Sequence, residues 1–202
     1  MKFSHPDSLP TPLREQISYR NLSEGERLFR RGDAAKYLHV VETGRIRLVR
    51  PTIEDKTATL QFASSEDLVG ENALYEDVYS YTAIANSASR VIVYDRSLLP
   101  QIIANYPDLV EDLLQKLIQK INYYQNNLEL REIRAAHQRV LQYLRYIPDS
   151  QLKTIYLDYP LQDIARQLGF TPSTLSRALS KLEEDGSIAR ESNAIVLYND
   201  VA

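Results

Sequence analysis

Residues 160–188 constrain the fold of this chain most strongly, because their pattern predicts two short helices joined by a tight turn. Apolar residues recur at helical spacing in each half: Leu161, Ile164, Ala165 and Leu168, then Leu175, Leu179 and Leu182. Gly169 stands where the first helix should stop. Thr171 suits a helix N-cap, and Pro172 suits the first helical position, where a missing N–H costs nothing. Two helices this close, with glycine between them, predict a helix–turn–helix.

The start of the second helix carries side chains that suit nucleic acid. Ser173, Thr174 and Ser176 offer hydroxyls for phosphates, and the guanidinium of Arg177 suits the O6 and N7 atoms of guanine. These residues are therefore the candidate DNA-reading surface.

Residues 187–198, SIARESNAIVLY, follow Gly186 and predict two short strands around Ser192 and Asn193. Such a hairpin after a helix–turn–helix is the wing of a winged helix, and the run KTIYLDY predicts a further strand before the helix pair. A purely structural helix pair is the alternative. A dimeric chain would weigh against it, because two-fold protein symmetry is what a palindromic DNA site requires.

The segment after Pro107 predicts a long helix with a coiled-coil seam. Its apolar residues step by 4, 3, 4, 3 and 4, the a and d spacing of a heptad repeat: Val110, Leu114, Leu117, Ile121, Tyr124 and Leu128. Leu113 and Ile118 broaden that stripe, so one face could cover a neighbouring domain while the seam meets the same helix of a second chain. An ordinary core helix is the alternative. The apolar register is lost after Arg131, which predicts a break or hinge near 132–137.

Short alternating runs fill the first half of the chain. They read RIRLVR (45–50), TATLQF (57–62), YTAIA (81–85) and RVIVYD (90–95), and glycine, aspartate and serine turns separate them. They predict an antiparallel β-roll of the jelly-roll kind. The expected fold is therefore α+β, with a β-roll over residues 1–107, a dimerisation helix and hinge over 108–134, and a winged helix–turn–helix over 135–202.

Composition excludes several function classes. The chain contains no cysteine, which excludes disulfides, thiolate zinc sites, cysteine-ligated iron–sulfur clusters and cysteine nucleophiles. It shows neither a signal peptide nor an apolar stretch of membrane-spanning length, so we expect a cytoplasmic protein without membrane contact. Residues 51–130 hold five basic and twelve acidic side chains, whereas residues 131–202 hold nine of each. The acidic middle argues against nucleic-acid contact there.

The whole chain resembles the CRP/FNR family of bacterial transcription regulators. The resemblance rests on LSEGERLFRRGDAAKYLHVVETGRIRL (22–48), which looks like the family's β-roll opening, and on PLQDIARQLGFTPSTLSRALSKLEEDGSI (160–188), which looks like its winged helix. It implies a homodimer joined through the long helix, with each recognition helix in a major groove of double-stranded DNA. RNA polymerase would be a further partner, and the loop 148–156 lies where activating relatives touch it.

Matched by position, Arg177 corresponds to the arginine that family members use on a guanine. Gln162, Thr171 and Thr174 correspond to positions near phosphates. The resemblance also implies a difference in DNA sequence preference, because this chain has Pro172 and Ser173 where the catabolite-activator type has Arg and Glu.

The resemblance extends to an effector cassette within GENALYEDVYSYTA (70–83). In the family, a Gly-Glu pair is followed about ten residues later by Arg-Ser or Arg-Thr. Glu71 would be the ribose partner and Thr82 matches the hydroxyl residue, but Tyr81 stands where the phosphate-binding arginine belongs. Tyr124 and Gln125 stand where cAMP-binding relatives place hydroxyl residues on the long helix. The candidate effector pocket comprises Gly70, Glu71, Asn72, Ala73, Tyr81, Thr82, Tyr124 and Gln125.

Two departures from the cassette make cAMP unexpected as an effector. Burying a phosphate without its cation costs on the order of several kcal/mol. Haem would need axial ligands, yet His5, His39 and His137 are scattered along the chain. A small organic acid held by an arginine, and a protein that needs no ligand, both stay open. Candidate arginines for such an acid are Arg27, Arg45 and Arg47. No cofactor or metal is expected.

Two functions from other classes compete with DNA binding. A β-roll metalloenzyme of the cupin type needs two histidines one residue apart, a glutamate and a third histidine, whereas the predicted roll offers one histidine. We therefore expect no enzymatic activity. A nucleotide- or small-ligand-binding module that acts on a protein partner is the second competitor. It would need no recognition helix, so residues 169–182 speak against it.

Overall fold

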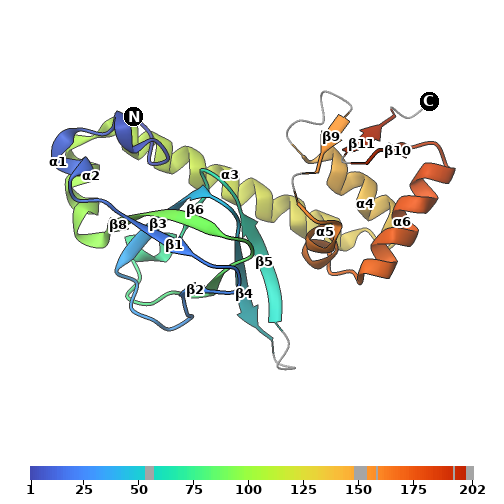
Figure 1. Cartoon of the computed structure of the whole chain (residues 1–202), viewed down its shortest axis with the longest axis horizontal. Coiled ribbons are helices and arrows are strands. Elements are labelled where there is room, and N and C mark those ends of the chain that lie inside the picture. Colours follow the sequence, from blue (N-terminus) through green and yellow to red (C-terminus); the bar gives the residue numbers. More distant parts are fainter. Residues whose placement is uncertain (53–56, 148–153, 158, 193, 199–202) are drawn as a thin grey trace. The chain divides into compact units, whose positions relative to one another are not determined.

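The structure is a computed structural model that describes residues 1–52, 57–147, 154–157, 159–192 and 194–198. It contains two compact units, residues 1–119 and residues 120–202. Figure 1 traces the elements along the chain. The division into roll, helix and DNA-binding parts at residues 107 and 134 stays a prediction.

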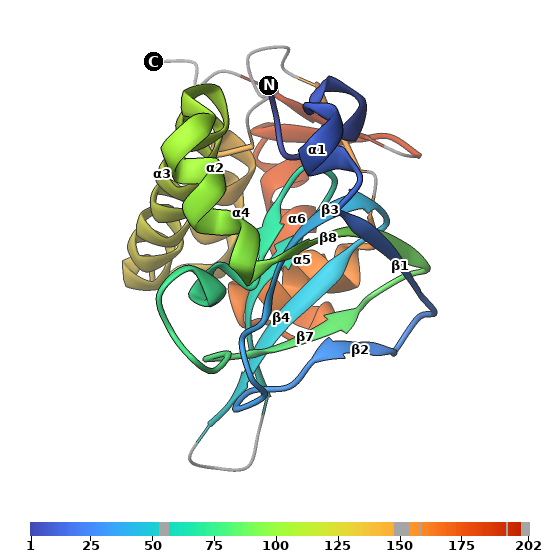
Figure 2. The same ribbon diagram turned by 90° about the vertical axis from the view of Figure 1, so that its left-hand side faces the viewer.

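The first unit is an antiparallel β-roll, which confirms the predicted fold class. Its described strands form two four-stranded sheets in the orders β1-β8-β3-β6 and β2-β7-β4-β5. Figure 2 shows β1, β3 and β8 beside one another, with β2, β4 and β7 in the other sheet. The strands are β1 (Ser18–Leu22), β2 (Arg27–Phe29), β3 (Tyr37–Thr43), β4 (Ile46–Pro51), β5 (Thr57–Ala63), β6 (Leu68–Val69), β7 (Thr82–Ala85) and β8 (Ser89–Asp95).

Alternation of side chains builds the core between the two sheets. Val41 and Val91 are fully buried on one sheet, and Ile46, Leu48 and Ala83 are fully buried on the other. Each large apolar side chain removed from water contributes about 1.5–3 kcal/mol, so this interior is what holds the sheets together.

A second core covers the outer face of the β1-β8-β3-β6 sheet. Phe3 and Tyr94 meet edge to face with ring centroids 5.1 Å apart, and the Tyr94 hydroxyl donates to the Phe3 carbonyl over 2.7 Å. Leu109 and Leu113 of the long helix are buried in the same cluster. One apolar face of that helix therefore packs on the roll, as its sequence predicts. Short helices complete the unit: η1 (Pro6–Ser8), α1 (Thr11–Arg14), η2 (Glu71–Leu74), η3 (Arg96–Leu98) and α2 (Leu99–Asn105).

The long helix α3 (Pro107–Glu132) leaves much of its predicted seam in solvent. Leu114, Ile121 and Leu128 are 54%, 54% and 62% exposed, and neighbouring Ile118 is 57% exposed. The other seam residues, Val110, Leu117 and Tyr124, are partly exposed. An ordinary core helix would bury these side chains, so this alternative is wrong for the single chain. The predicted break is confirmed, because α3 ends at Glu132 and the next helix begins at Ala136.

The second unit has the elements of a winged helix–turn–helix. Its core gathers apolar side chains from every helix and strand of the unit, including Val140, Ile164, Leu179 and Ile195. The strands form an antiparallel sheet in the order β10-β11-β9. The elements are α4 (Ala136–Arg145), β9 (Thr154–Tyr156), α5 (Leu161–Leu168), α6 (Pro172–Glu184), β10 (Ile188–Arg190) and β11 (Ala194–Leu197).

Some predicted features lie outside the described residues. They are residues 148–153 of the candidate polymerase loop, Asp158 of the predicted KTIYLDY strand, and Asn193 of the wing turn. Across the described part of the chain, no helix has the length and apolarity that crossing a membrane requires.

Candidate nucleic-acid interface and effector pocket

The turn between α5 and α6 has the predicted geometry. Gly169 adopts a left-handed conformation with φ of 71°, and the Phe170 N–H closes the helix end on the Ala165 carbonyl over 2.8 Å. Thr171 then caps α6, because its Oγ1 accepts a hydrogen bond from the Thr174 N–H at 3.2 Å. These local bonds fix where the second helix begins.

Three hydroxyl groups gather at the first turn of α6. The Oγ1 atom of Thr171 lies 2.9 Å from the hydroxyl oxygens of both Ser173 and Thr174. Thr171 and Ser173 are exposed and Thr174 is partly exposed. Because a helix N-terminus also carries partial positive charge, this turn suits a phosphate group.

Arg177 lies one turn further along the exposed face of α6. Its Nε donates to the Ser173 carbonyl at 3.4 Å, and among the described residues no carboxylate pairs with its guanidinium. Ser176 is exposed beside it. The opposite face of the helix is anchored by Leu175 and Leu179, both buried. Arg177 is thus held on a rigid element with most of its donors available to a base edge.

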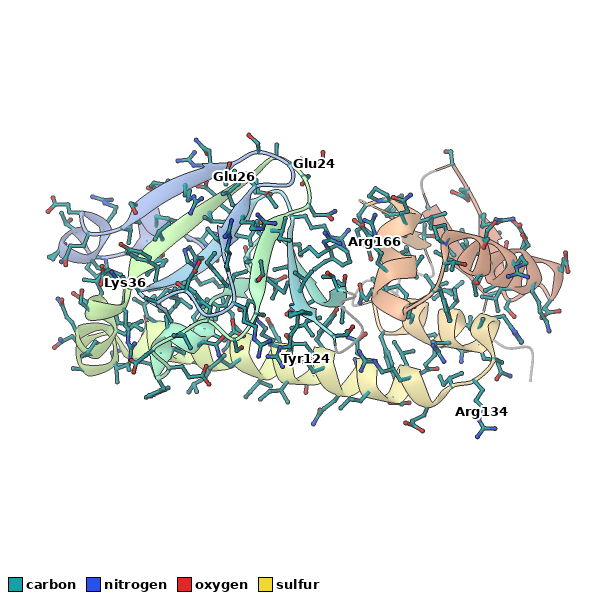
Figure 3. All side chains as sticks on the ribbon, turned by 90° about the horizontal axis from the view of Figure 1, so that it is seen from below. Glu24, Glu26, Lys36, Tyr124, Arg134 and Arg166 are labelled. Atoms are coloured by element: carbon teal, nitrogen blue, oxygen red, sulfur yellow. The ribbon has the colours of Figure 1, made fainter. Side chains whose placement is uncertain are left out.

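Gln162 is exposed in the first turn of α5. Two residues nearby form an ion pair: Nη1 of Arg166 lies 3.2 Å from the buried Oδ1 of Asp163, and Figure 3 labels Arg166 on this helix. Gln162 is therefore presented to solvent by a helix whose buried face is fixed.

Sequence reasoning missed the link between the wing and α6. Arg190 of β10 donates from Nε and Nη2 to Oε2 of Glu183 at 2.8 and 2.6 Å, and its backbone N–H donates to Oε1 at 3.2 Å. The side-chain hydrogen bonds from Arg190 lower the pKa of the Glu183 carboxyl. The two residues are seven positions apart with a turn between them, so no periodic pattern pairs them.

In the roll, the phenol of Tyr81 occupies the cassette. Its hydroxyl accepts a hydrogen bond from the Gly70 N–H at 2.8 Å and donates one to Oε2 of Glu71 at 2.8 Å. Tyr81 is buried at 4% exposure. Thr82 Oγ1 accepts from the Arg31 N–H at 3.0 Å. The structure therefore brings Gly70, Glu71 and Tyr81 together, and Tyr81 contacts the group predicted to bind ribose.

Aromatic rings fill the space beneath the cassette. Phe29 stacks on Tyr79 with centroids 3.7 Å apart, and the Tyr81 ring lies 5.6 Å from Phe29. A Cβ atom on Gly70 would lie 3.0 Å from Tyr79 Cε1 and 3.3 Å from His39 Nδ1. Glycine, with φ of 83°, is thus required by the backbone conformation and by the crowded rings below.

The remaining candidate pocket residues serve local structure or belong to the other unit. Asn72 donates to Glu76 Oε2 at 2.8 Å and accepts from the Ser80 hydroxyl at 3.3 Å, while Ala73 is fully buried. Tyr124 and Gln125 belong to the other unit, and their part in the pocket stays a prediction.

The candidate arginines of the roll have different surroundings. The guanidinium of Arg45 lies 4.5 Å from the centroid of the Phe62 ring, and Arg27 is exposed. Arg50, which sequence reasoning did not single out, donates from Nε to the Ser80 carbonyl at 3.2 Å, next to Tyr81 in the chain. Within the described residues, no three His, Asp or Glu side chains are grouped to hold a metal ion.

Comparison with known proteins agrees with this architecture. Residues 19–106 match the model of the cyclic nucleotide-binding domain, and residues 138–200 match the model of the Crp-like helix–turn–helix domain. The chain is 25% identical to the transcriptional regulator LdrP of Thermus thermophilus over 190 residues, covering 89% of this chain and 92% of that protein. It is 26% identical to the nitrogen fixation regulation protein FixK of Bradyrhizobium diazoefficiens over 175 residues, covering 84% and 73%.

A solved structure shares the fold over nearly the whole chain. FixK2 from Bradyrhizobium japonicum superposes with a TM-score of 0.73 at 21% identity, covering 91% of this chain and 93% of that one. The two matched segments lie within the first and the second compact unit respectively, and the named relatives are regulators. From its roll, its helix–turn–helix and these relatives, the chain belongs to the CRP/FNR family of transcription regulators.

Proposed function

We propose that the protein binds a palindromic DNA site as a homodimer and does so without cAMP. The main support for DNA binding is the exposed first half of α6, where Arg177 follows the hydroxyls of Thr171, Ser173 and Thr174. The hydroxyls suit backbone phosphates, which position the protein, and the guanidinium suits guanine, which gives specificity.

A second copy of this chain is the partner proposed for the exposed face of α3. Leu114, Ile121 and Leu128 are each more than half exposed and follow heptad spacing. Together with Ile118, these three side chains would form an apolar stripe that a monomer leaves in water. Pairing of identical helices about a two-fold axis covers the stripe and presents two recognition helices symmetrically, which matches a palindromic site.

The independence from cAMP rests on Tyr81. Its hydroxyl already holds the Gly70 N–H and the Glu71 carboxylate, the groups expected to meet the nucleotide. A cyclic nucleotide would have to displace the buried phenol of Tyr81. Its phosphate would then lie at a position where the family has an arginine and this chain has none. An unpaired phosphate in such a site is strongly disfavoured.

The DNA-binding part of the proposal is tested by selecting a preferred duplex from a random pool and measuring its affinity by fluorescence anisotropy. Arg177→Ala should weaken binding to the selected duplex by about 10-fold or more and leave non-specific binding nearly unchanged. Arg134→Ala is the matched control, because Arg134 is exposed and extends away from the ribbon in Figure 3. Equal affinities of the Arg177→Ala variant and the wild type would overturn the proposed role of α6.

A further inference from the structure

Arg139 connects the end of the long helix to the start of the next one. It lies in the first turn of α4, and its Nε and Nη2 atoms donate to the Ile133 carbonyl at 2.9 and 2.7 Å. Ile133 directly follows Glu132, the last residue of α3. The two bonds converge on one carbonyl oxygen and fix both the position and the plane of the guanidinium.

The same guanidinium also reaches the turn of the helix–turn–helix. Its Nη1 donates to the carbonyl of Leu168, the last residue of α5, at 3.4 Å. Its central carbon lies 5.0 Å from the centroid of the Phe170 ring, within cation–π range. Phe170 immediately precedes Thr171, the N-cap of α6. One side chain therefore contacts the segment that ends α3 and the segment that begins the recognition helix.

The chemistry of these contacts points to positioning rather than to charge pairing. Carbonyls at helix C-termini lack intrahelical donors, and Arg139 donates to two such carbonyls, one just after α3 and one at the end of α5. Among the described residues no carboxylate forms an ion pair with this half-buried guanidinium. Lysine could not reproduce the arrangement, because its ammonium has no planar fork and cannot lie flat on a ring while bonding two carbonyls.

We propose that Arg139 is a positioning residue that holds the recognition helix at a set orientation to the C-terminal part of α3. Residues 120–132 of α3 lie in the same compact unit as α5 and α6, and Arg139 bridges the break at residues 133–135 within that unit. In a dimer joined through α3, this contact sets the separation and angle of the two recognition helices. The inference rests on the proposed function, because it requires a dimer that reads two half-sites.

The dependence of affinity on half-site spacing distinguishes a positioning role of Arg139 from a role in stability alone. A dimer with fixed recognition helices discriminates between palindromes whose half-sites differ in separation, because both helices must enter the groove together. We would measure affinities of Arg139→Lys and of the wild type for the selected palindrome, for the same palindrome lengthened or shortened by one base pair, and for a single half-site.

The expected result is a loss of about 10-fold or more on the palindrome with a change of less than about 2-fold on the half-site. Discrimination between the spacings should also shrink. Phe170→Leu removes the ring and keeps every hydrogen-bond donor of Arg139. It should also reduce discrimination between the spacings, but by less than Arg139→Lys does. Arg134→Lys is the control, since Arg134 is an exposed arginine of the same break.

Wild-type spacing discrimination in both Arg139→Lys and Phe170→Leu would overturn the inference. Equal losses on palindrome and half-site, with a lowered melting temperature, would overturn it too, because they indicate a purely structural role. Failure of the proposed function looks different: the wild type itself would then show no preference for a palindrome over a half-site.

Discussion

The hydroxyl of Tyr81 donates a 2.8 Å hydrogen bond to the carboxylate of Glu71, across the cassette in which CRP/FNR relatives would hold a cyclic nucleotide. The same oxygen accepts a hydrogen bond from the Gly70 N–H, so one phenol satisfies two groups of the cassette. Stacked rings of Phe29 and Tyr79 lie beneath it. The interior of the roll is thus packed by its own side chains around the groups that the family resemblance assigns to a ligand.

Removal of the phenol oxygen should weaken the roll. Tyr81→Phe keeps the ring but leaves the buried Gly70 N–H and the Glu71 carboxylate without this partner, which should lower the free energy of unfolding by about 1–3 kcal/mol. Urea denaturation followed by circular dichroism measures it. Tyr75→Phe is the control, because Tyr75 is 85% exposed and should change little. An unchanged midpoint for Tyr81→Phe would mean that the two hydrogen bonds contribute nothing.

Restoring the cation should create affinity for cAMP. In Tyr81→Arg the guanidinium can meet the cyclic phosphate, and Glu71 is released from the phenol to accept from ribose hydroxyls. Millimolar cAMP should then raise the melting temperature of the variant and leave that of the wild type unchanged. Glu71→Gln in the same background should reduce the shift. A larger shift for the wild type than for Tyr81→Arg would contradict the assignment of the cassette.

The buried imidazole of His39 should make the roll sensitive to acid. Desolvation lowers its pKa from 6.5 to about 4, against a backbone hydrogen bond at Val69 that raises it, and the charge of Arg20 lowers it further. Between pH 6.5 and 4 the unfolded chain binds more protons than the folded one. Stability is therefore full above pH 6.5, falls as the pH drops, and has lost about 3 kcal/mol below pH 4.

His39→Leu tests this dependence because it removes the buried imidazole and puts an apolar side chain in its place. The difference in unfolding free energy between the variant and the wild type, measured from pH 7.5 to 4.5, should rise in favour of the variant as the pH falls. A difference that is independent of pH would contradict the buried neutral imidazole.

A charge in the α3 seam should separate the proposed dimer. Leu114→Glu places carboxylates of two chains against each other in an apolar contact, so analytical ultracentrifugation should show a monomer at concentrations where the wild type is dimeric. Ile103→Glu is the matched control, since Ile103 is 49% exposed on α2, outside the seam. If both variants sediment as the wild type does, the seam is not the contact between chains.

Local chemistry explains which elements could be predicted from the sequence. Gly169, Thr171 and Pro172 define the boundaries of α5 and α6 through short-range effects, and alternation in β4 and β8 reports one buried face. Strand β1 escaped prediction because four of its five residues are exposed and no apolar alternation is present.

Long-range contacts explain what could not be predicted. The loss of the cassette arginine is visible in the sequence, but the bond from Tyr81 to Glu71 depends on how the β7 end meets the turn at Gly70. Arg139 likewise stands in an ordinary helical position, and only the fold brings it to Leu168, 29 residues away. Such roles have no periodicity and depend on the packed tertiary structure.

Titration of the wild-type protein with its selected palindrome, with and without saturating cAMP, shows whether Tyr81 takes the place of a ligand. We expect tight binding with no nucleotide present, a stoichiometry of two chains per palindrome, and affinities that agree within about 2-fold in the two titrations. A requirement for cAMP that changes the affinity by about 10-fold or more would contradict this expectation, because Tyr81 would then not take the place of the ligand.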